Sequence, residues 1–184
     1  IGTGATSVQV VPQLARAAKE VYVFQRTPSS VGVRNNSFTD PEWWKTLEPG
    51  WQAERQASFT SVVSGEHPEK DLVGDEWSKI WGTDTQSEPT TAEQAAALEQ
   101  HDFEVMETLR ARIDDVIDDP ETAEKLKPWY GKHCKRVTFH DEYLEAFNEP
   151  NVHLVDTDGR GVQEVNAKGP VVDGTQYELD LLIY

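Results

Sequence analysis

The first seven residues place small side chains where a strand would turn into a helix. Gly2, Gly4 and Ser7 follow a G-x-G-x-x-small spacing, and an amphipathic run comes directly after them. In such a turn the first glycine allows the sharp bend, the second lets the backbone approach a diphosphate, and a small third residue lets helix and strand pack closely. The unbonded N–H groups and the dipole of the first helical turn then favour an anion. The spacing predicts a dinucleotide-phosphate site, with Ile1 as the end of a buried strand.

The next apolar run, Val21 to Phe24, predicts a second strand, which ends in Gln25-Arg26-Thr27. Proteins that bind NAD usually carry Asp or Glu at this point for the ribose 2′-hydroxyl. Arg26 instead offers a guanidinium, which holds a 2′-phosphate by charge-assisted hydrogen bonds, with Gln25 and Thr27 as polar neighbours. The residues therefore favour NADP over NAD. For the glycines alone, a turn without a ligand stays the alternative.

The composition is that of a soluble, acidic protein of one domain, or of one domain with an insertion. The chain has 184 residues and a formal net charge of −16, which argues against nucleic acid or an anionic membrane as a partner. No apolar run approaches the ~20 residues that cross a bilayer. The single Cys134 excludes an internal disulfide and suits a reducing cytoplasm, and no histidine spacing predicts a metal site. Two basic islands, Arg26 and residues 132–136, stand out in this acidic chain and predict anion binding.

Hydrophobic periodicity and turn residues predict an α/β protein. Residues 1–27 give strand, helix and strand, and a helical lobe covers about 38–127. Helices are predicted over 41–60, about 92–118 and 120–127, with a long loop over 64–90 and a short helix over 141–147. Further strands are predicted over 137–139, 151–155, 162–165, 171–172 and 177–184. The predicted fold is a Rossmann-type FAD/NAD(P)-binding domain with a parallel sheet, an inserted helical lobe and a C-terminal β meander.

Most of the six tryptophans lie in the predicted lobe. We expect them to fill a helical core, because large aromatic side chains at irregular helical spacing are most often buried. The alternative is that one or two of them line the mouth of a ligand site.

Three stretches of the chain resemble the type I Baeyer–Villiger monooxygenases. They are IGTGATSVQVVPQLA…VYVFQRTP, KPWYGKHCKRVTFHDEYLEAFNEPNVHLVDT and YELDLLIY. In that family a nicotinamide domain of this pattern is inserted into a flavin domain. The resemblance implies that residues 1–184 are the NADP-binding domain of a larger FAD-containing enzyme, whose FAD motif lies outside this chain. Both ends fall inside apolar runs, and we expect a fragment for that reason too.

The resemblance also implies the chemistry of the parent enzyme. NADPH reduces FAD, the reduced flavin reacts with O2, and the peroxide so formed attacks a ketone to give an ester or a lactone. The expected partners are the ketone, O2 and the remaining FAD domain of the same protein, with no nucleic acid and no membrane. The fragment by itself is expected to be inactive.

Residue roles follow from the resemblance at matching positions. Arg136 matches the active-site arginine, which stabilises the anionic peroxide without protonating it. Arg26 and Thr27 match the pair that holds the 2′-phosphate, and Lys135 matches the second phosphate-binding base. The expected contacts to the diphosphate and ribose come from Gly2, Thr3, Gly4, Ala5, Thr6, Ser7 and Gln9.

Two alternatives share part of this pattern. A flavin monooxygenase that oxidises nitrogen or sulfur has the same logic in its NADPH domain, and a stand-alone NADP-binding module without catalysis would need only the turn and the basic residues. A pyridine-nucleotide disulfide reductase is disfavoured because this chain has no C-x-x-C pair.

Overall fold

The computed structural model describes residues 1–66, 68–82 and 90–184, and the chain divides into two compact units. The first unit comprises residues 1–32 and 99–184, and the second comprises residues 33–98. The second unit is shorter than the predicted lobe, since residues 99–127 belong to the first unit. Within the described ranges, no helix combines the length and the apolarity needed to cross a bilayer.

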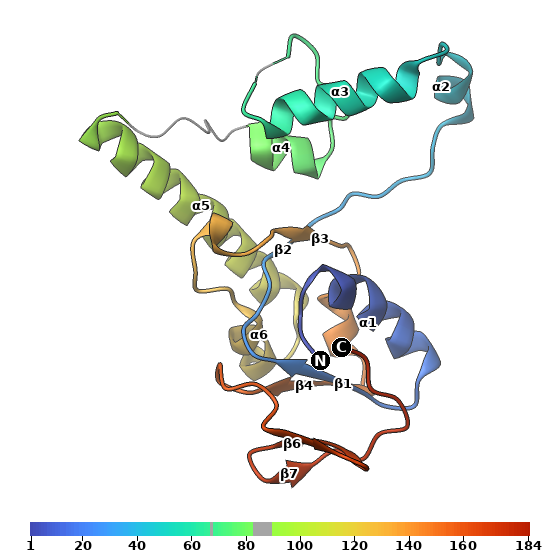
Figure 1. The fold of residues 1–184 in the computed structure, drawn as a ribbon, viewed down its shortest axis with the longest axis vertical. Helices are drawn as coiled ribbons and strands as arrows, with labels where there is room; N and C mark the ends of the chain where they lie inside the picture. The colour runs from blue at the N-terminus through green and yellow to red at the C-terminus, as the bar shows by residue number, and fades with distance from the viewer. Residues whose placement is uncertain (67, 83–89) are drawn as a thin grey trace. The chain divides into compact units, whose positions relative to one another are not determined.

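The first unit combines helices with short strands (Figure 1). Its helical elements are α1 (Ala5–Ala17), most of α5 (Ala92–Val116), α6 (Pro120–Leu126) and the 3-10 turns η1 (Lys132–Cys134) and η2 (Glu145–Asn148). Its strands are β1 (Val21–Gln25), β2 (Val31–Gly32), β3 (Thr138–Phe139), β4 (Val152–Asp156), β5 (Glu164–Asn166), β6 (Gly169–Val172) and β7 (Thr175–Gln176).

The parallel pair β1–β4 lies between two apolar layers. Its register runs from Val21 opposite Val152 to Gln25 opposite Asp156. Because side chains alternate along a strand, Val21 and Val23 face the main core, whereas Phe24 faces a smaller cluster that includes Val172 of β6. In Figure 1 the pair accordingly lies between α1 and the antiparallel β5–β6–β7 sheet.

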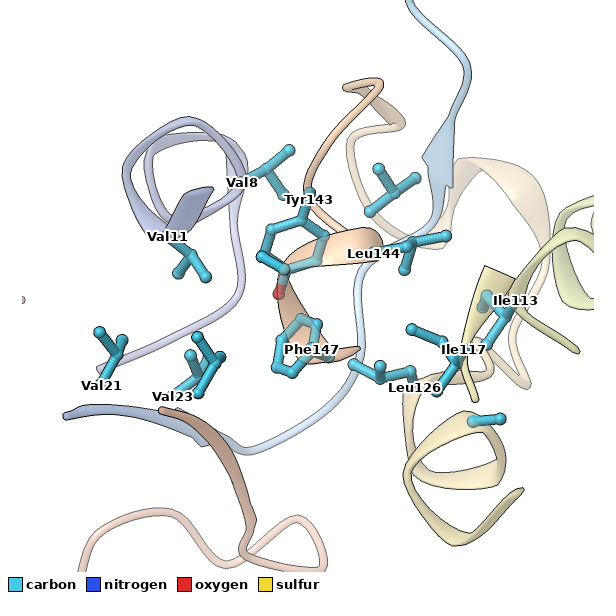
Figure 2. Close-up of a cluster of buried hydrophobic side chains, with 14 residues drawn as sticks. Val8, Val11, Val21, Val23, Ile113, Ile117, Leu126, Tyr143, Leu144 and Phe147 are labelled. Atoms are coloured by element: carbon cyan, nitrogen blue, oxygen red, sulfur yellow. The ribbon is translucent and has the colours of Figure 1, made fainter. Parts of the chain in front are cut away.

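The main core is built where η2 meets α1, β1 and the α5–α6 pair. Figure 2 shows Tyr143 and Phe147 between the valines of α1 and β1 on one side and the apolar side chains of α5 and α6 on the other. The two rings pack edge to face, with centroids 5.2 Å apart. Burial of each large apolar side chain contributes about 1.5–3 kcal/mol to folding. This core is the rigid base for the loops described below.

A second, short parallel ladder joins β2 to β3. Val31 lies opposite Thr138, and the backbone N–H of Thr138 donates to the Ser30 carbonyl at 3.0 Å. Arg112 of α5 joins β2 to the residue that follows β3, because its guanidinium donates to the carbonyls of Val31 (3.0 Å) and His140 (3.4 Å). Burial lowers the pKa of Arg112. The ladder places the segment that precedes β2 beside the segment that precedes β3, although about a hundred residues separate them in sequence.

The second unit contains α2 (Pro41–Lys45), α3 (Trp51–Val63), α4 (Glu76–Gly82) and the start of α5. Asp40 caps α2, since its carboxylate accepts the Glu42 N–H at 2.9 Å. The tryptophans do not form the predicted core here. Trp43 and Trp44 are 41% and 56% exposed, and their rings each form a T-shaped pair with that of Trp51. The prediction that these two side chains fill a core is therefore wrong.

Several predicted elements are confirmed, among them α5, α6 with its Asp119 cap, β1 and β4. The helix predicted over 41–60 is wrong in its middle, because Gly50 adopts a φ of +100° between α2 and α3. The loop predicted over 64–90 contains α4, and its residues 67 and 83–89 lie outside the described ranges. The strand predicted over 177–184 is absent, and Ile1 is exposed and in no strand.

Candidate functional site

The turn before α1 has the conformation that its glycines predict. Gly2 has a φ of +96°, in the left-handed region that favours glycine, and its N–H donates to the Phe24 carbonyl at 2.9 Å. Gly4 is the N-cap of α1, and a Cβ atom added there would meet no heavy atom within 4 Å. The backbone of the turn is therefore tied to the end of β1 and open on its outer side.

The N-terminus of α1 is chemically ready for an anion. No side chain caps its first N–H groups, and its first turn holds no acidic residue. Thr6 and Gln9 are exposed, and Ala5 and Ser7 are half-buried. Free N–H groups and the positive end of a 13-residue helix dipole stabilise a diphosphate without any basic side chain.

Thr3 has a structural contact instead of an open hydroxyl. Its side chain is buried and donates to the Thr27 carbonyl at 2.8 Å, while the Ser29 hydroxyl donates to the Thr3 carbonyl. Thr3 therefore joins the glycine turn to the segment after β1, and any contact it makes with a ligand would come from its backbone.

Lys135 reaches back to the residues that follow β1. Its ammonium donates to the Thr27 hydroxyl, and it lies 3.2 Å from the Pro28 carbonyl oxygen. Burial lowers the pKa of Lys135, and the positive charge of Arg26 lowers it further. Of the residues that the structure describes, no carboxylate pairs with either cation. Two neighbouring cations without a carboxylate can bind an external anion by charge-assisted hydrogen bonds.

Arg26 is exposed at the carboxyl end of β1, and its stem lies against Gly161, where an added Cβ would be 3.9 Å from Cδ of Arg26. Gln25, by contrast, is fully buried, and its amide donates to the Lys125 carbonyl of α6 at 2.7 Å. The alternation of β1 explains the difference, because it sends neighbouring side chains to opposite faces. The expectation that Gln25 is a polar neighbour of the phosphate is therefore wrong.

Arg136 is separated from this cluster by the backbone. Lys135 has extended dihedral angles, with φ −138° and ψ 157°, so the side chains of Lys135 and Arg136 leave the chain on opposite sides. Arg136 is exposed, and the next residue, Val137, is buried. The structure thus brings together the glycine turn, Arg26, Thr27 and Lys135, and directs Arg136 elsewhere.

No protein-family model matches the chain. The whole chain is, however, 54% identical over 191 residues to the Baeyer–Villiger monooxygenase ATR8 of Stachybotrys chlorohalonatus, of which it covers 31%. Over its whole length, the chain is similar to part of the Baeyer–Villiger monooxygenases. It spans about a third of the length of the curated relatives it matches.

Solved structures of Baeyer–Villiger monooxygenases and related enzymes share this fold. The polycyclic ketone monooxygenase of the thermophilic fungus Thermothelomyces thermophila superposes with a TM-score of 0.81 at 45% identity, over 97% of this chain and 31% of that one. The OTEMO complex with FAD and NADP gives a TM-score of 0.74 at 28% identity, over 97% of this chain and 36% of that one. The mixed α/β architecture with small parallel sheets is therefore that of a Baeyer–Villiger monooxygenase domain.

Tyr130 is a residue beside Lys135 that the sequence alone did not single out. Its hydroxyl donates to the Pro28 carbonyl at 2.9 Å and accepts the Ser30 N–H at 3.0 Å, and Lys135 lies over its ring. The available signal was an aromatic residue five positions before Lys135, inside the stretch that carries the family resemblance. Among residues 1–66, 68–82 and 90–184, no cluster of His, Cys, Asp or Glu is suited to a metal ion.

Proposed function

We propose that the chain is the NADPH-binding part of a flavin-dependent monooxygenase that inserts one oxygen atom of O2 next to a ketone carbonyl to give an ester or a lactone. The similarity to Baeyer–Villiger monooxygenases over the whole chain and a solved neighbour that holds both FAD and NADP support the proposal. The observation that carries it is the pair of cations, Arg26 and Lys135, beside the bare N-terminus of α1. A diphosphate and a 2′-phosphate are the two anions of NADPH that such an arrangement matches.

The residues present fit this cofactor. The diphosphate would lie on the turn from Gly2 to Ser7, with Gln9 toward the ribose. The 2′-phosphate would be held by Arg26, Thr27 and Lys135, whose ammonium has a pKa lowered by burial and by Arg26. A phosphate between the two cations would offset their mutual repulsion. The site would therefore favour NADP, which carries the 2′-phosphate, over NAD.

We assign Arg136 as the arginine of the reaction centre. An arginine side chain does not lose its proton in a protein, so it stabilises negative charge that develops on oxygen without protonating it. The side chains of Lys135 and Arg136 leave the backbone on opposite sides. This supports a role for Lys135 at the nicotinamide cofactor and for Arg136 at the reacting oxygen. FAD, when bound to the parent enzyme, would be the group that reacts with O2. Its binding motif is not among these residues.

The finer fold follows the same proposal. We take residues 1–184 as one NADP-binding domain of Rossmann type with an inserted helical lobe, and β5, β6 and β7 as its C-terminal meander. The partners would be the FAD domain of the parent enzyme, a ketone and O2, with no nucleic acid. The exposed thiol of Cys134 suits a cytoplasmic parent enzyme.

Binding of NADP+ and NAD+ to Arg26→Ala tests the proposal. Loss of a charge-assisted contact of about 1.5–3 kcal/mol should raise the Kd for NADP+ by about 10- to 100-fold and leave that for NAD+ nearly unchanged. Arg16→Ala is the matched control, because Arg16 is an exposed arginine of α1 that pairs with Glu142. Equal losses for both nucleotides would contradict the 2′-phosphate assignment.

A further inference from the structure

Tyr130 lies under the phosphate end of the proposed cofactor site and is tied to it in two ways. Through its hydroxyl it bonds to both sides of the segment after Thr27, at the Pro28 carbonyl and the Ser30 N–H. Through its ring it supports Lys135, whose Nζ lies 5.1 Å from the ring centroid. One side chain therefore contacts both Lys135 and the backbone that follows Thr27.

The Tyr130 hydroxyl fixes the backbone next to Thr27, one of the residues proposed to bind the 2′-phosphate. Ser30 is fully buried, so its N–H has no water to replace a lost tyrosine hydroxyl. Pro28 follows Thr27 directly, and its carbonyl also faces the Lys135 ammonium at 3.2 Å. The Tyr130 hydroxyl and the Lys135 ammonium thus converge on the same carbonyl oxygen, and the bond from Tyr130 holds that oxygen in place.

The ring acts on the charge of Lys135. Burial and Arg26 both disfavour its ammonium form, as the lowered pKa shows. The face of an aromatic ring attracts a cation and partly offsets that penalty. Burial raises the pKa of Tyr130 itself, so the phenol stays neutral and remains a donor to Pro28 at physiological pH.

We propose that Tyr130 is a positioning residue that sets the preference of this site for a 2′-phosphorylated nucleotide. It does so without touching the ligand, by holding Thr27 and Lys135 in the geometry that receives the phosphate. This proposal rests on the proposed function, since it assumes that Arg26 and Lys135 bind a 2′-phosphate. It predicts an effect on the ratio of NADP+ to NAD+ affinity, because the two nucleotides differ only in that phosphate.

The test measures Kd values of NADP+ and NAD+ for the full-length protein by calorimetry. Tyr130→Phe keeps the ring and removes the hydroxyl, and Tyr130→Leu removes both. The NADP+ preference should fall by about 3- to 10-fold in Tyr130→Phe and further in Tyr130→Leu. Tyr177→Phe is the control, because Tyr177 packs in the smaller apolar cluster of the same unit, and its preference should equal that of the wild type.

The outcomes separate this proposal from the one it rests on. Equal losses for both nucleotides in Tyr130→Phe, or no loss for either, would show a structural role only and overturn the inference. If the wild-type protein itself does not prefer NADP+, the proposed function fails as well. A wild-type preference that depends on Arg26 but not on Tyr130 would overturn the inference alone.

Discussion

Arg26 and Lys135 of the first unit differ in their partners from the paired basic residues of the second unit. In the second unit, Arg34 forms an ion pair with Asp75, and Lys79 forms one with Glu76. In the first unit, Arg26 and Lys135 are neighbours, and within the described residues neither has a carboxylate partner. A cation paired within the protein contributes modestly to stability, whereas an uncompensated pair costs stability and binds an external anion. The contrast supports the proposal that the ligand binds to the first unit.

The two units also differ in the number of apolar side chains that they bury. The first unit has a continuous apolar core around Tyr143 and Leu144, on which the loops of the site stand. Among the described residues of the second unit, Val62 is the only buried apolar side chain. The other buried residues there are Ser58 and Ser78. A site that must hold two cations close together needs a rigid base, and the first unit supplies it.

Truncation of buried side chains should give the largest effect and test this comparison directly. Leu144→Ala in the first unit should lower the free energy of unfolding by about 2–5 kcal/mol, because Leu144 is almost fully buried in the main core. Val62→Ala in the second unit removes less apolar surface and should cost about 1.5 kcal/mol. Urea denaturation of both variants measures the difference. Equal losses would show that the two units are packed to the same degree.

Removal of Arg136 should give the next largest effect, on the reaction itself. In the full-length enzyme, Arg136→Ala should slow ester formation from the ketone by about 10²- to 10³-fold, the usual loss when a group that stabilises developing negative charge is deleted. The Kd for NADP+ should stay near its wild-type value. Arg55→Ala is the control from the second unit, where Arg55 donates to the Leu72 carbonyl. Ester formation near the wild-type rate in Arg136→Ala would refute the role assigned to it.

Local features of the site could be predicted from the sequence, and contacts between distant segments were harder. The Gly2–Gly4 turn, α1 and β1 follow from spacing and periodicity over fewer than thirty residues. The approach of Lys135 to Thr27 depends on the β2–β3 ladder across about a hundred residues, and only the family resemblance pointed to it. The cofactor contacts at these positions stay predictions.

What the sequence did not predict has physical reasons. Tyr130 acts through two hydrogen bonds and a ring contact that no periodicity shows. The helix expected over 41–60 breaks because Gly50 takes a positive φ, which helix propensity alone does not reveal. Trp43 and Trp44 look like core residues by composition, but α2 is too short to bury both.

Charge removal at Lys135 should have opposite effects on stability and on binding. The folded-state pKa of Lys135 lies below its ordinary 10.5, so the unfolded chain holds the proton more tightly and the charged side chain lowers stability at neutral pH. Lys135→Met should therefore raise the free energy of unfolding at pH 7, and this gain should fade as the pH rises through the lowered pKa toward 10.5. The same variant should weaken NADP+ binding by about tenfold, because one phosphate contact is lost.

Lys79→Met is the control for Lys135→Met from the second unit. A hydrogen bond from Lys79 lowers the pKa of Glu76, so this pair stabilises the folded state. Lys79→Met should lower the free energy of unfolding slightly and leave NADP+ affinity unchanged. Urea denaturation at pH 7 and pH 10.5 and NADP+ titration measure both variants. A loss of stability at pH 7 in Lys135→Met would contradict the view that its charge is uncompensated.

Trp44→Ser should give the smallest effect and decides what the exposed tryptophans do. The indole is 56% exposed and contacts Trp51 edge to face at 5.7 Å, so its loss should cost only about 0.5–1.5 kcal/mol of stability. Phe38→Ser is the matched control, since Phe38 is fully exposed, and it should cost nothing measurable. If Trp44→Ser lowers the free energy of unfolding as much as Leu144→Ala does, Trp44 belongs to a buried core after all. Unchanged stability with a raised KM for the ketone would instead place Trp44 at the mouth of the substrate site, and ligand contacts would then extend beyond the first unit.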